Sequence, residues 1–137
     1  MNGELNRVWQ TICEKQAAQG HNALLEWEKI WLNVGSLLLS IDNGGLVSYF
    51  YNSYADRLSE CLDALAKIGA MDLRTQLLNF CRLFPGHVPR TMEGRNDVIN
   101  SWGDEVNVTI QEIDDETFPL LPDLERRLDE FVYKNIR

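Results

Sequence analysis

Two adjacent glycines, Gly44 and Gly45, constrain the fold most strongly, because they separate a long apolar stretch from a cluster of aromatic residues. Glycine has no Cβ atom, so either residue can adopt a positive φ angle and allow a sharp turn. The aromatic residues that follow at once are Tyr49, Phe50 and Tyr51. The pattern therefore predicts a tight turn and, directly after it, a short aromatic helix over residues 45–51.

Capping and stop signals surround a longer helix after the aromatic one. Ser53 and Asp56 have the spacing of a capping box, in which two side chains bond free backbone groups at the start of a helix. Gly69 stands where that helix, expected over 54–68, would end in the left-handed conformation. Asn43 and Asn52, at the two ends of the aromatic unit, are expected to bond backbone groups at helix termini. The segment contains no nucleophile–base pair and no metal-ligand spacing, so it predicts packing and backbone shape.

The aromatic residues Tyr49, Phe50, Tyr51 and Tyr54 support two interpretations. They could pack between helices, with the tyrosine hydroxyls hydrogen-bonded at the edge of the core. They could instead form a partner-binding surface, because tyrosine offers a large contact area at low entropy cost.

This stretch resembles the central motif of the DMP19-like family of bacterial proteins, otherwise described as a domain of unknown function. The family pattern is Asn-Gly-Gly-aromatic-x-x-Tyr-Phe-Tyr-Asn-Ser, followed further along by Ala-Leu-x-x-Ile-Gly-Ala. The matching positions are Asn43, Gly44, Gly45, Tyr49, Phe50, Tyr51, Asn52, Ser53, Ala64, Leu65, Ile68, Gly69 and Ala70, and the departures are Leu46 and Ser48. The resemblance extends to about residue 85 and implies an all-helical fold. It offers no catalytic residues: the best-known member is a DNA mimic, and other members resemble immunity proteins of toxin systems.

Apolar residues recur at helical spacing through most of the chain. The spacing predicts helices over 4–19, 23–41, 71–84 and 91–102, and a last helix that starts at Pro122. The 23–41 helix is apolar on most of its surface, so we expect it at the centre, with Gly35 letting a neighbouring helix approach.

Residues 106–111 differ from the rest, because apolar Val106, Val108 and Ile110 alternate with polar residues as they would in a strand. An extended segment and a distorted helix are both consistent with this alternation. We therefore predict one all-α domain over residues 1–137, a bundle of about seven helices in which 106–111 could be extended.

The composition excludes several classes of protein. A chain of 137 residues fits one domain and can bury a core without disulfides. No secretion leader is recognised, and no apolar run approaches the ~20 residues that span a bilayer. Cys13, Cys61 and Cys81 lie on apolar helical stripes and are expected to be reduced core thiols.

His21 and His87 lie in predicted loops, without a second ligand at metal spacing. We expect a cytoplasmic protein without a metal, a cofactor or a membrane partner.

Negative charge is concentrated in the last third of the chain. Residues 1–92 hold nine acids and eight bases, a net of −1, whereas residues 93–137 hold twelve acids and five bases, a net of −7; together these give −8. The asymmetry argues against nucleic acid or an anionic membrane and suits a basic protein partner, although a solvated face that keeps the protein soluble explains it equally well. The candidate partner-binding residues are Asp104, Glu105, Glu112, Asp114, Asp115, Glu116 and Asp123.

Three functions follow as hypotheses. The first is a non-enzymatic inhibitor, an immunity protein whose acidic third occludes the basic active-site cleft of a cognate bacterial toxin. Complementary charge would speed encounter, and a few buried anchors would give the complex its lifetime. The alternative is a DNA mimic that sequesters a DNA-binding protein; since phosphates recur every ~3.4 Å along a strand, a homodimer would supply a longer row of carboxylates than a monomer. The third is an enzyme, such as a small hydrolase, which a deep pocket lined by histidine or paired carboxylates would support.

Overall fold

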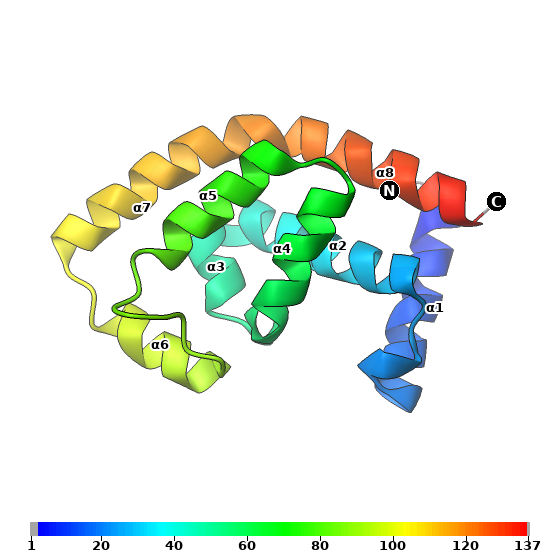
Figure 1. The fold of residues 1–137 in the computed structure, drawn as a ribbon, viewed down its shortest axis with the longest axis horizontal. Coiled ribbons are helices and arrows are strands. Elements are labelled where there is room, and N and C mark those ends of the chain that lie inside the picture. The colour runs from blue at the N-terminus through cyan, green and yellow to red at the C-terminus, as the bar shows by residue number, and fades with distance from the viewer. Residues whose placement is uncertain (1–2, 137) are drawn as a thin grey trace.

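The chain folds almost entirely into helices (Figure 1), and the structure, a computed structural model, describes residues 3–136. The α-helices are α1 (Gly3–Gln19), α2 (Glu26–Gly44), α3 (Leu46–Phe50), α4 (Leu58–Lys67), α5 (Met71–Cys81), α6 (Met92–Asn100), α7 (Asp104–Thr117) and α8 (Leu121–Ile136). Three short 3-10 helices lie between them: η1 (His21–Ala23), η2 (Ser53–Arg57) and η3 (Phe118–Leu120). The all-α prediction is confirmed, with eight α-helices over residues 3–136 instead of about seven.

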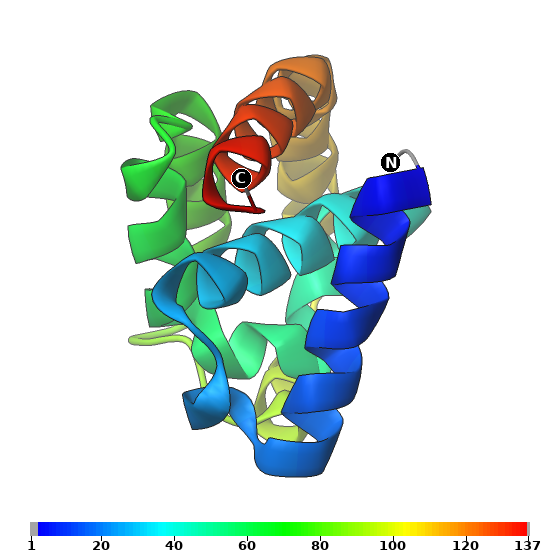
Figure 2. The same cartoon turned by 90° about the vertical axis from the view of Figure 1, so that its right-hand side faces the viewer.

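Helix α2 is the centre of the fold, as its apolar sequence predicts. Its buried apolar residues are Ile30, Trp31, Leu32, Val34, Leu37 and Ile41. Helices α1, α3, α4 and α8 all pack against it, and Figure 2 shows α1 crossing it while α8 lies along it. Gly35 lies under the ring of Trp9, because an added Cβ would be only 2.9 Å from two atoms of that ring. The close approach predicted at Gly35 is confirmed.

Two predicted helix boundaries move by three residues. The helix expected from residue 23 begins at Glu26, because residues 21–23 form η1 and the Glu28 carboxylate accepts a hydrogen bond from the Leu25 N–H at 2.7 Å. The helix expected to reach residue 84 ends at Cys81. The helix predicted after Thr91 begins as expected, with the Thr91 hydroxyl accepting from the Gly94 N–H at 3.1 Å.

The capping box predicted at Ser53 and Asp56 is wrong. Residues 53–57 form the 3-10 helix η2, and α4 begins only at Leu58. The Asp56 carboxylate does not bond the local backbone, because it accepts a hydrogen bond from the guanidinium of Arg95 at 2.7 Å. An ion pair with a distant helix has displaced the local cap.

Gly69 ends α4 as predicted. Its φ angle is +76°, and the Ala70 N–H donates to the carbonyl of Leu65 at 2.9 Å, the bond expected of a left-handed helix stop. A Cβ here would lie 2.9 Å from Nη1 of Arg127 on α8, but that flexible side chain can move aside, so the positive φ angle is what requires glycine. This stop turns the chain directly into α5.

Residues 106–111 are helical, so the extended alternative is wrong. Ile110, Ile113 and Thr117 recur at helical spacing along the inward side of α7, which packs against α5. Val108, the middle residue of the alternating run, is 58% exposed on the other side. Packing against α5 has therefore overridden the strand-like local pattern.

Helices α7 and α8 form one arch over α5, joined by η3 (Figure 1). The last helix begins at Leu121, one residue before the predicted Pro122. Pro119 and Pro122 lie in the first turns of η3 and α8, where proline's missing N–H costs no hydrogen bond. The arch carries most of the acidic third along one edge of the molecule.

The aromatic residues divide between core and surface. Tyr49 and Phe50 are buried, and Phe50 stacks on Phe80 with ring centroids 4.6 Å apart. Tyr51 and Tyr54 are 40% and 47% exposed. Core packing is therefore confirmed for the first pair. The Tyr51 hydroxyl donates a hydrogen bond to Oδ1 of Asn100 at 2.9 Å, as the packing interpretation expects, and partner contact stays a prediction for Tyr51 and Tyr54.

Arg95 of α6 is a fully buried cation that joins three parts of the chain. Its guanidinium donates to the Asp56 carboxylate at 2.7 Å. It also donates to four backbone carbonyl oxygens, at 2.8–3.2 Å, those of Phe50, Asn52, Pro89 and Arg90. The end of α3, the start of η2 and the connector before α6 are thus held by one side chain.

The three cysteines are free thiols, as predicted. Burial is the main cause that raises the pKa of Cys61 to about 12 and that of Cys81 to about 11. Both side chains therefore stay protonated near neutral pH. Because the thiolate is the reactive form of cysteine, these two thiols are expected to be unreactive there.

Candidate functional site

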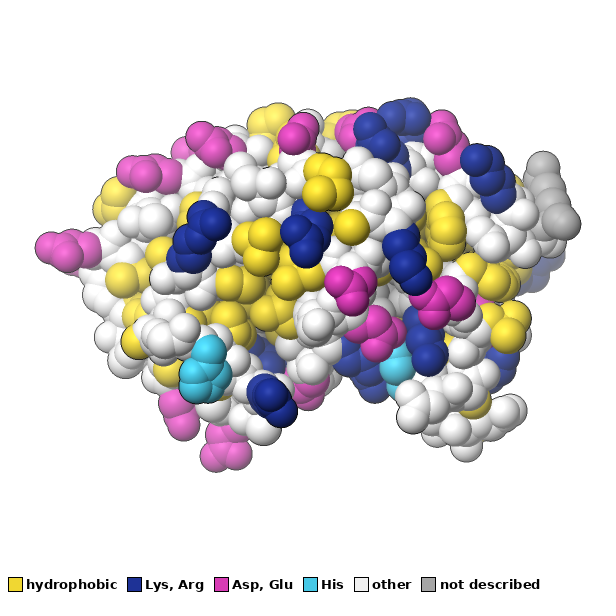
Figure 3. All heavy atoms as spheres, in the orientation of Figure 1, with side chains coloured by type: hydrophobic (Ala, Val, Ile, Leu, Met, Phe, Trp, Pro, Cys, Tyr) yellow, Lys and Arg dark blue, Asp and Glu magenta, His cyan; other side chains and the backbone are white. Residues whose placement is uncertain are grey.

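One side of α7, here called the acidic face, carries exposed carboxylates. Its residues are Asp104, Glu105, Glu112, Asp115 and Glu116. At about 100° per residue they fall within about a third of the helix circumference, opposite the buried Ile113 and Thr117. No lysine, arginine or histidine occurs between residues 96 and 125. Figure 3 shows acidic side chains along the edge of the molecule that α7 forms.

The charges of the acidic face are not neutralised within the described residues. Asp115 accepts a hydrogen bond from the Gln111 amide at 2.9 Å, and Glu116 accepts one from the Gln76 amide at 3.2 Å. Both donors are uncharged. Over residues 3–136, none of the five carboxylates forms an ion pair. The face therefore presents five negative charges to a partner.

Two of the seven predicted contact residues lie outside this face. Asp123 is exposed on α8, but its carboxylate accepts hydrogen bonds from Arg127 and Arg126, each at 2.7 Å. These bonds hold the pKa of Asp123 below its ordinary value, so its charge is already compensated. Asp114 is buried and serves the fold instead of the surface.

Asp114 caps helix α3 from inside the protein. Its Oδ1 accepts a hydrogen bond from the N–H of Leu46, the first residue of α3, at 3.1 Å. Its carboxylate lies against Gly45, where an added Cβ would be 2.5 Å from Oδ2. Gly45 also has φ +81° and ψ −174°, a conformation that only glycine adopts readily. The glycine turn and the acidic helix, far apart in sequence, thus form one joint.

The Asp114→Asn substitution tests the electrostatics of this joint. Burial raises the pKa of Asp114 above its ordinary value of 3.8, although the Leu46 N–H opposes the rise. The folded protein therefore keeps a proton that the unfolded chain has released, and the free energy of unfolding falls as pH rises through the folded pKa. Asparagine keeps an oxygen acceptor but cannot ionise. We expect wild type to gain stability relative to the variant as pH falls from 7 towards 4; urea unfolding across that range measures the difference, and a constant difference would contradict the prediction.

The remaining motif residues have mixed roles. The side-chain amide of Asn52 donates to the Ser48 carbonyl at 2.7 Å, so its predicted role at a helix terminus is confirmed. Asn43 is exposed near the end of α2, and its side chain bonds no residue that the structure describes. Gly44 is the last residue of α2 and has no positive φ, so the turn depends on Gly45 alone.

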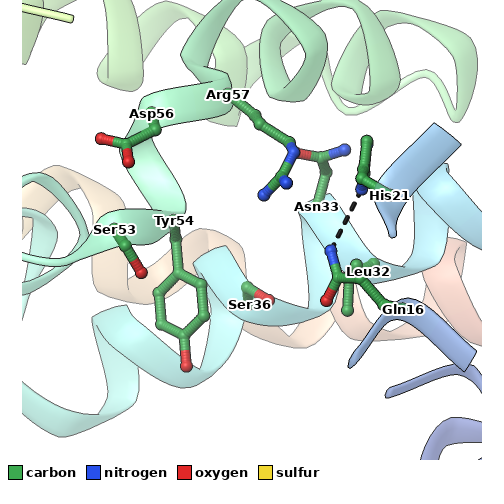
Figure 4. A pocket seen from close by; sticks show the side chains of 9 residues that line it. All are labelled: Gln16, His21, Leu32, Asn33, Ser36, Ser53, Tyr54, Asp56 and Arg57. Carbon is green, nitrogen blue, oxygen red and sulfur yellow. Dashed lines mark hydrogen bonds between the residues drawn. The ribbon is translucent and has the colours of Figure 1, made fainter. Parts of the chain in front are cut away.

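A polar groove of about 540 Å³ lies between the end of α1 with η1, the middle of α2 and η2 (Figure 4). His21 lines it, yet both ring nitrogens are engaged: Nε2 with a Glu60 carboxylate oxygen at 2.7 Å, and Nδ1 with the Gln16 amide at 3.1 Å. Asp56 lines the groove too, but Figure 4 shows it well away from His21. His21 therefore connects η1 to α4, and both of its ring nitrogens already have partners within the protein.

Two further kinds of site were sought among the described residues, a metal centre and a membrane span. Within residues 3–136, no group of three or more histidine, cysteine or acidic side chains is placed to hold a metal ion. No helix in that range is both long and apolar enough to cross a membrane.

The fold and this surface define the class of protein: a small, acidic, all-α domain with a face of unpaired carboxylates. The chain belongs to the DMP19-like protein family, whose model matches residues 22–135. The match extends well beyond residue 85, and it includes the Gly45–Asp114 joint and all of α7. No curated protein and no solved structure matches the chain.

Proposed function

We propose that this protein is a non-enzymatic, DNA-mimic type of inhibitor, whose acidic face occupies the nucleic-acid-binding surface of a basic protein. The number of unpaired charges along α7, and the length of helix they cover, carry the proposal. Asp104 and Glu116 are twelve residues apart, so the face is ~18 Å long at a helix rise of 1.5 Å per residue. One strand of duplex DNA presents about five phosphates over that length. The face presents five carboxylates.

An exposed apolar residue completes the surface. The carboxylates form two groups, Asp104 with Glu105 and Glu112 with Asp115 and Glu116, and Val108 lies between them on the same side of the helix. Charges at the rim of an interface mainly set the rate of association, whereas apolar anchors extend the lifetime of the complex. The face offers both kinds of contact to a basic partner.

Mimicry takes precedence over toxin immunity because of the family match. The chain matches the DMP19-like family, whose best-known member is a DNA mimic. No described residue distinguishes a toxin from another basic partner. Both functions would use the same surface. DNA mimicry and toxin immunity differ in what competes for the partner. A DNA mimic and duplex DNA must compete for the same surface of the partner, whereas an immunity protein need not compete with DNA.

Neutralising the acidic face should slow partner association. The variant carries Asp104→Asn, Glu105→Gln, Glu112→Gln, Asp115→Asn and Glu116→Gln. We expect its association rate at low salt to fall at least about tenfold, with a flatter dependence on ionic strength, because the steering field is lost. The partner is first captured from a lysate of the native host by the immobilised wild-type protein, and rates are then measured by surface plasmon resonance.

A second variant of equal net charge is the control. It carries Glu4→Gln, Glu14→Gln, Asp63→Asn, Asp72→Asn and Glu93→Gln, all exposed acids outside α7. We expect it to associate nearly as wild type does. Equal slowing of both variants would show that net charge, and not the acidic face, governs binding, and would contradict the proposal. A captured partner with a toxin domain, retained in the presence of duplex DNA, would favour immunity.

A further inference from the structure

An apolar groove, separate from the acidic face, lies between α1, α2 and α8. It is lined by Trp9, Trp31, Gly35, Leu38, Leu39 and Leu128 and has a volume of about 200 Å³. Because Gly35 has no side chain, the Trp9 ring rests on the backbone of α2, with its centroid 5.4 Å from that of Trp31. Figure 2 shows α1 and α8 on either side of α2 here. Leu39, at the edge, is 47% exposed.

Three carboxylates surround this apolar floor. Asp42 belongs to α2, and Glu125 and Asp129 belong to α8, one helical turn apart. None of the three forms an ion pair with another residue in the range 3–136. Burial, and then the neighbouring Glu125, raise the pKa of Asp129. The rim of the groove therefore carries three carboxylates that no lysine or arginine side chain within residues 3–136 pairs.

We propose that this groove binds a cationic amphipathic helix of a protein partner, with an apolar side chain between Trp9 and Leu128 and lysine or arginine residues on the rim. The volume is smaller than the ~300–1,000 Å³ of typical small-molecule sites and suits one or two side chains. An apolar floor with a charged rim is how grooves recognise one face of a helix. The negative rim repels nucleic acid and anionic lipid. This inference is independent of the acidic face.

The test uses a designed helical peptide of leucine, alanine and lysine, with its leucines on one face. Two control peptides replace either its lysines with glutamate or its leucines with serine. Backbone amide shifts of the protein are followed by NMR as each peptide is added. We expect the lysine–leucine peptide alone to shift groove residues of α1, α2 and α8. Equal binding of either control, or shifts confined to α7, would overturn the proposal.

Matched substitutions place one cation in each surface. Leu39→Arg puts a cation at the groove, and Val108→Arg puts one on α7 at a residue that is also exposed. We expect the first to weaken peptide binding at least tenfold and the second to leave it nearly unchanged; equal effects would contradict the groove assignment. Asp42→Asn with Asp129→Asn, which keeps the shape of the groove, should also weaken binding. The amide shifts of the groove residues are also compared at several protein concentrations without peptide. If these shifts changed with protein concentration, the occupant of the groove would be a second copy of the chain, and the proposed partner would be wrong.

Discussion

Replacing Arg95 with methionine should cost at least about 3 kcal/mol of unfolding free energy, because an unpaired buried polar group costs about 1–3 kcal/mol and this change removes the donor from four carbonyls. The Phe50 carbonyl accepts from Nε inside the core, where water cannot easily replace the bond. Methionine fills a similar volume, so the loss reports hydrogen bonding more than packing. Urea unfolding followed by tryptophan fluorescence measures the effect.

Arg90→Met is the matched control for this substitution. Arg90 lies on the connector before α6 that Arg95 holds, but its own side chain is exposed, and surface substitutions usually change stability by less than about 0.5 kcal/mol. Arg95→Lys should remain well below wild type, since an ammonium cannot match the five donated bonds of the guanidinium. If Arg95→Met unfolded with the stability of Arg90→Met, Arg95 would not hold these three segments together.

Replacing Gly45 with alanine should destabilise the protein by about 3 kcal/mol or more. The backbone conformation is costly for any residue with a Cβ, by about 1–3 kcal/mol, and the new methyl group would also overlap the Asp114 carboxylate. Relief of that overlap requires Asp114 to release the Leu46 N–H, which leaves the start of α3 without its acceptor. Chemical unfolding of the variant measures the sum of these effects.

A double-mutant cycle with Asp114→Ala separates the two causes. In the Asp114→Ala background, the cost of Gly45→Ala should fall, because the overlap is gone, but it should remain above zero because the backbone strain persists. Gly103→Ala is the control in open space, since a Cβ there meets nothing within 4 Å and φ is −102°. An equal cost of Gly45→Ala in both backgrounds would show that Asp114 does not contact the turn as described.

Local sequence signals predicted most of the helices. Where a prediction from these signals was wrong, a contact between residues far apart in the sequence explains the error. The stop at Gly69 and the cap at Thr91 depend on bonds within a few residues, so the sequence contains all that they need. The capping box at Ser53 and Asp56 failed because Asp56 bonds Arg95, thirty-nine positions away. The extended alternative for residues 106–111 was wrong because contact with α5 determines which side of α7 is buried. That contact is between segments far apart in the sequence, so the local pattern could not reveal it.

The candidate surface was predicted in part. Five of the seven acids chosen from the sequence share one exposed face, as the concentration of negative charge in the last third suggested. Asp114 looks the same in sequence as its neighbour Asp115, and only the position of Leu46 shows that one is a buried cap and the other a surface charge. Arg95 carried no signal at all, since a lone arginine on a short helix is ordinarily solvated.

Competition between this protein and duplex DNA for the captured partner tests the proposed function most directly. Fluorescently labelled duplex is bound to the partner, and the protein is titrated while fluorescence anisotropy reports the fraction of DNA still bound. We predict that wild type and the control variant with neutralised acids outside α7 displace the DNA, whereas the variant with a neutralised acidic face does not. A ternary complex, in which the protein binds the partner and the DNA stays bound, would contradict DNA mimicry by the acidic face of α7.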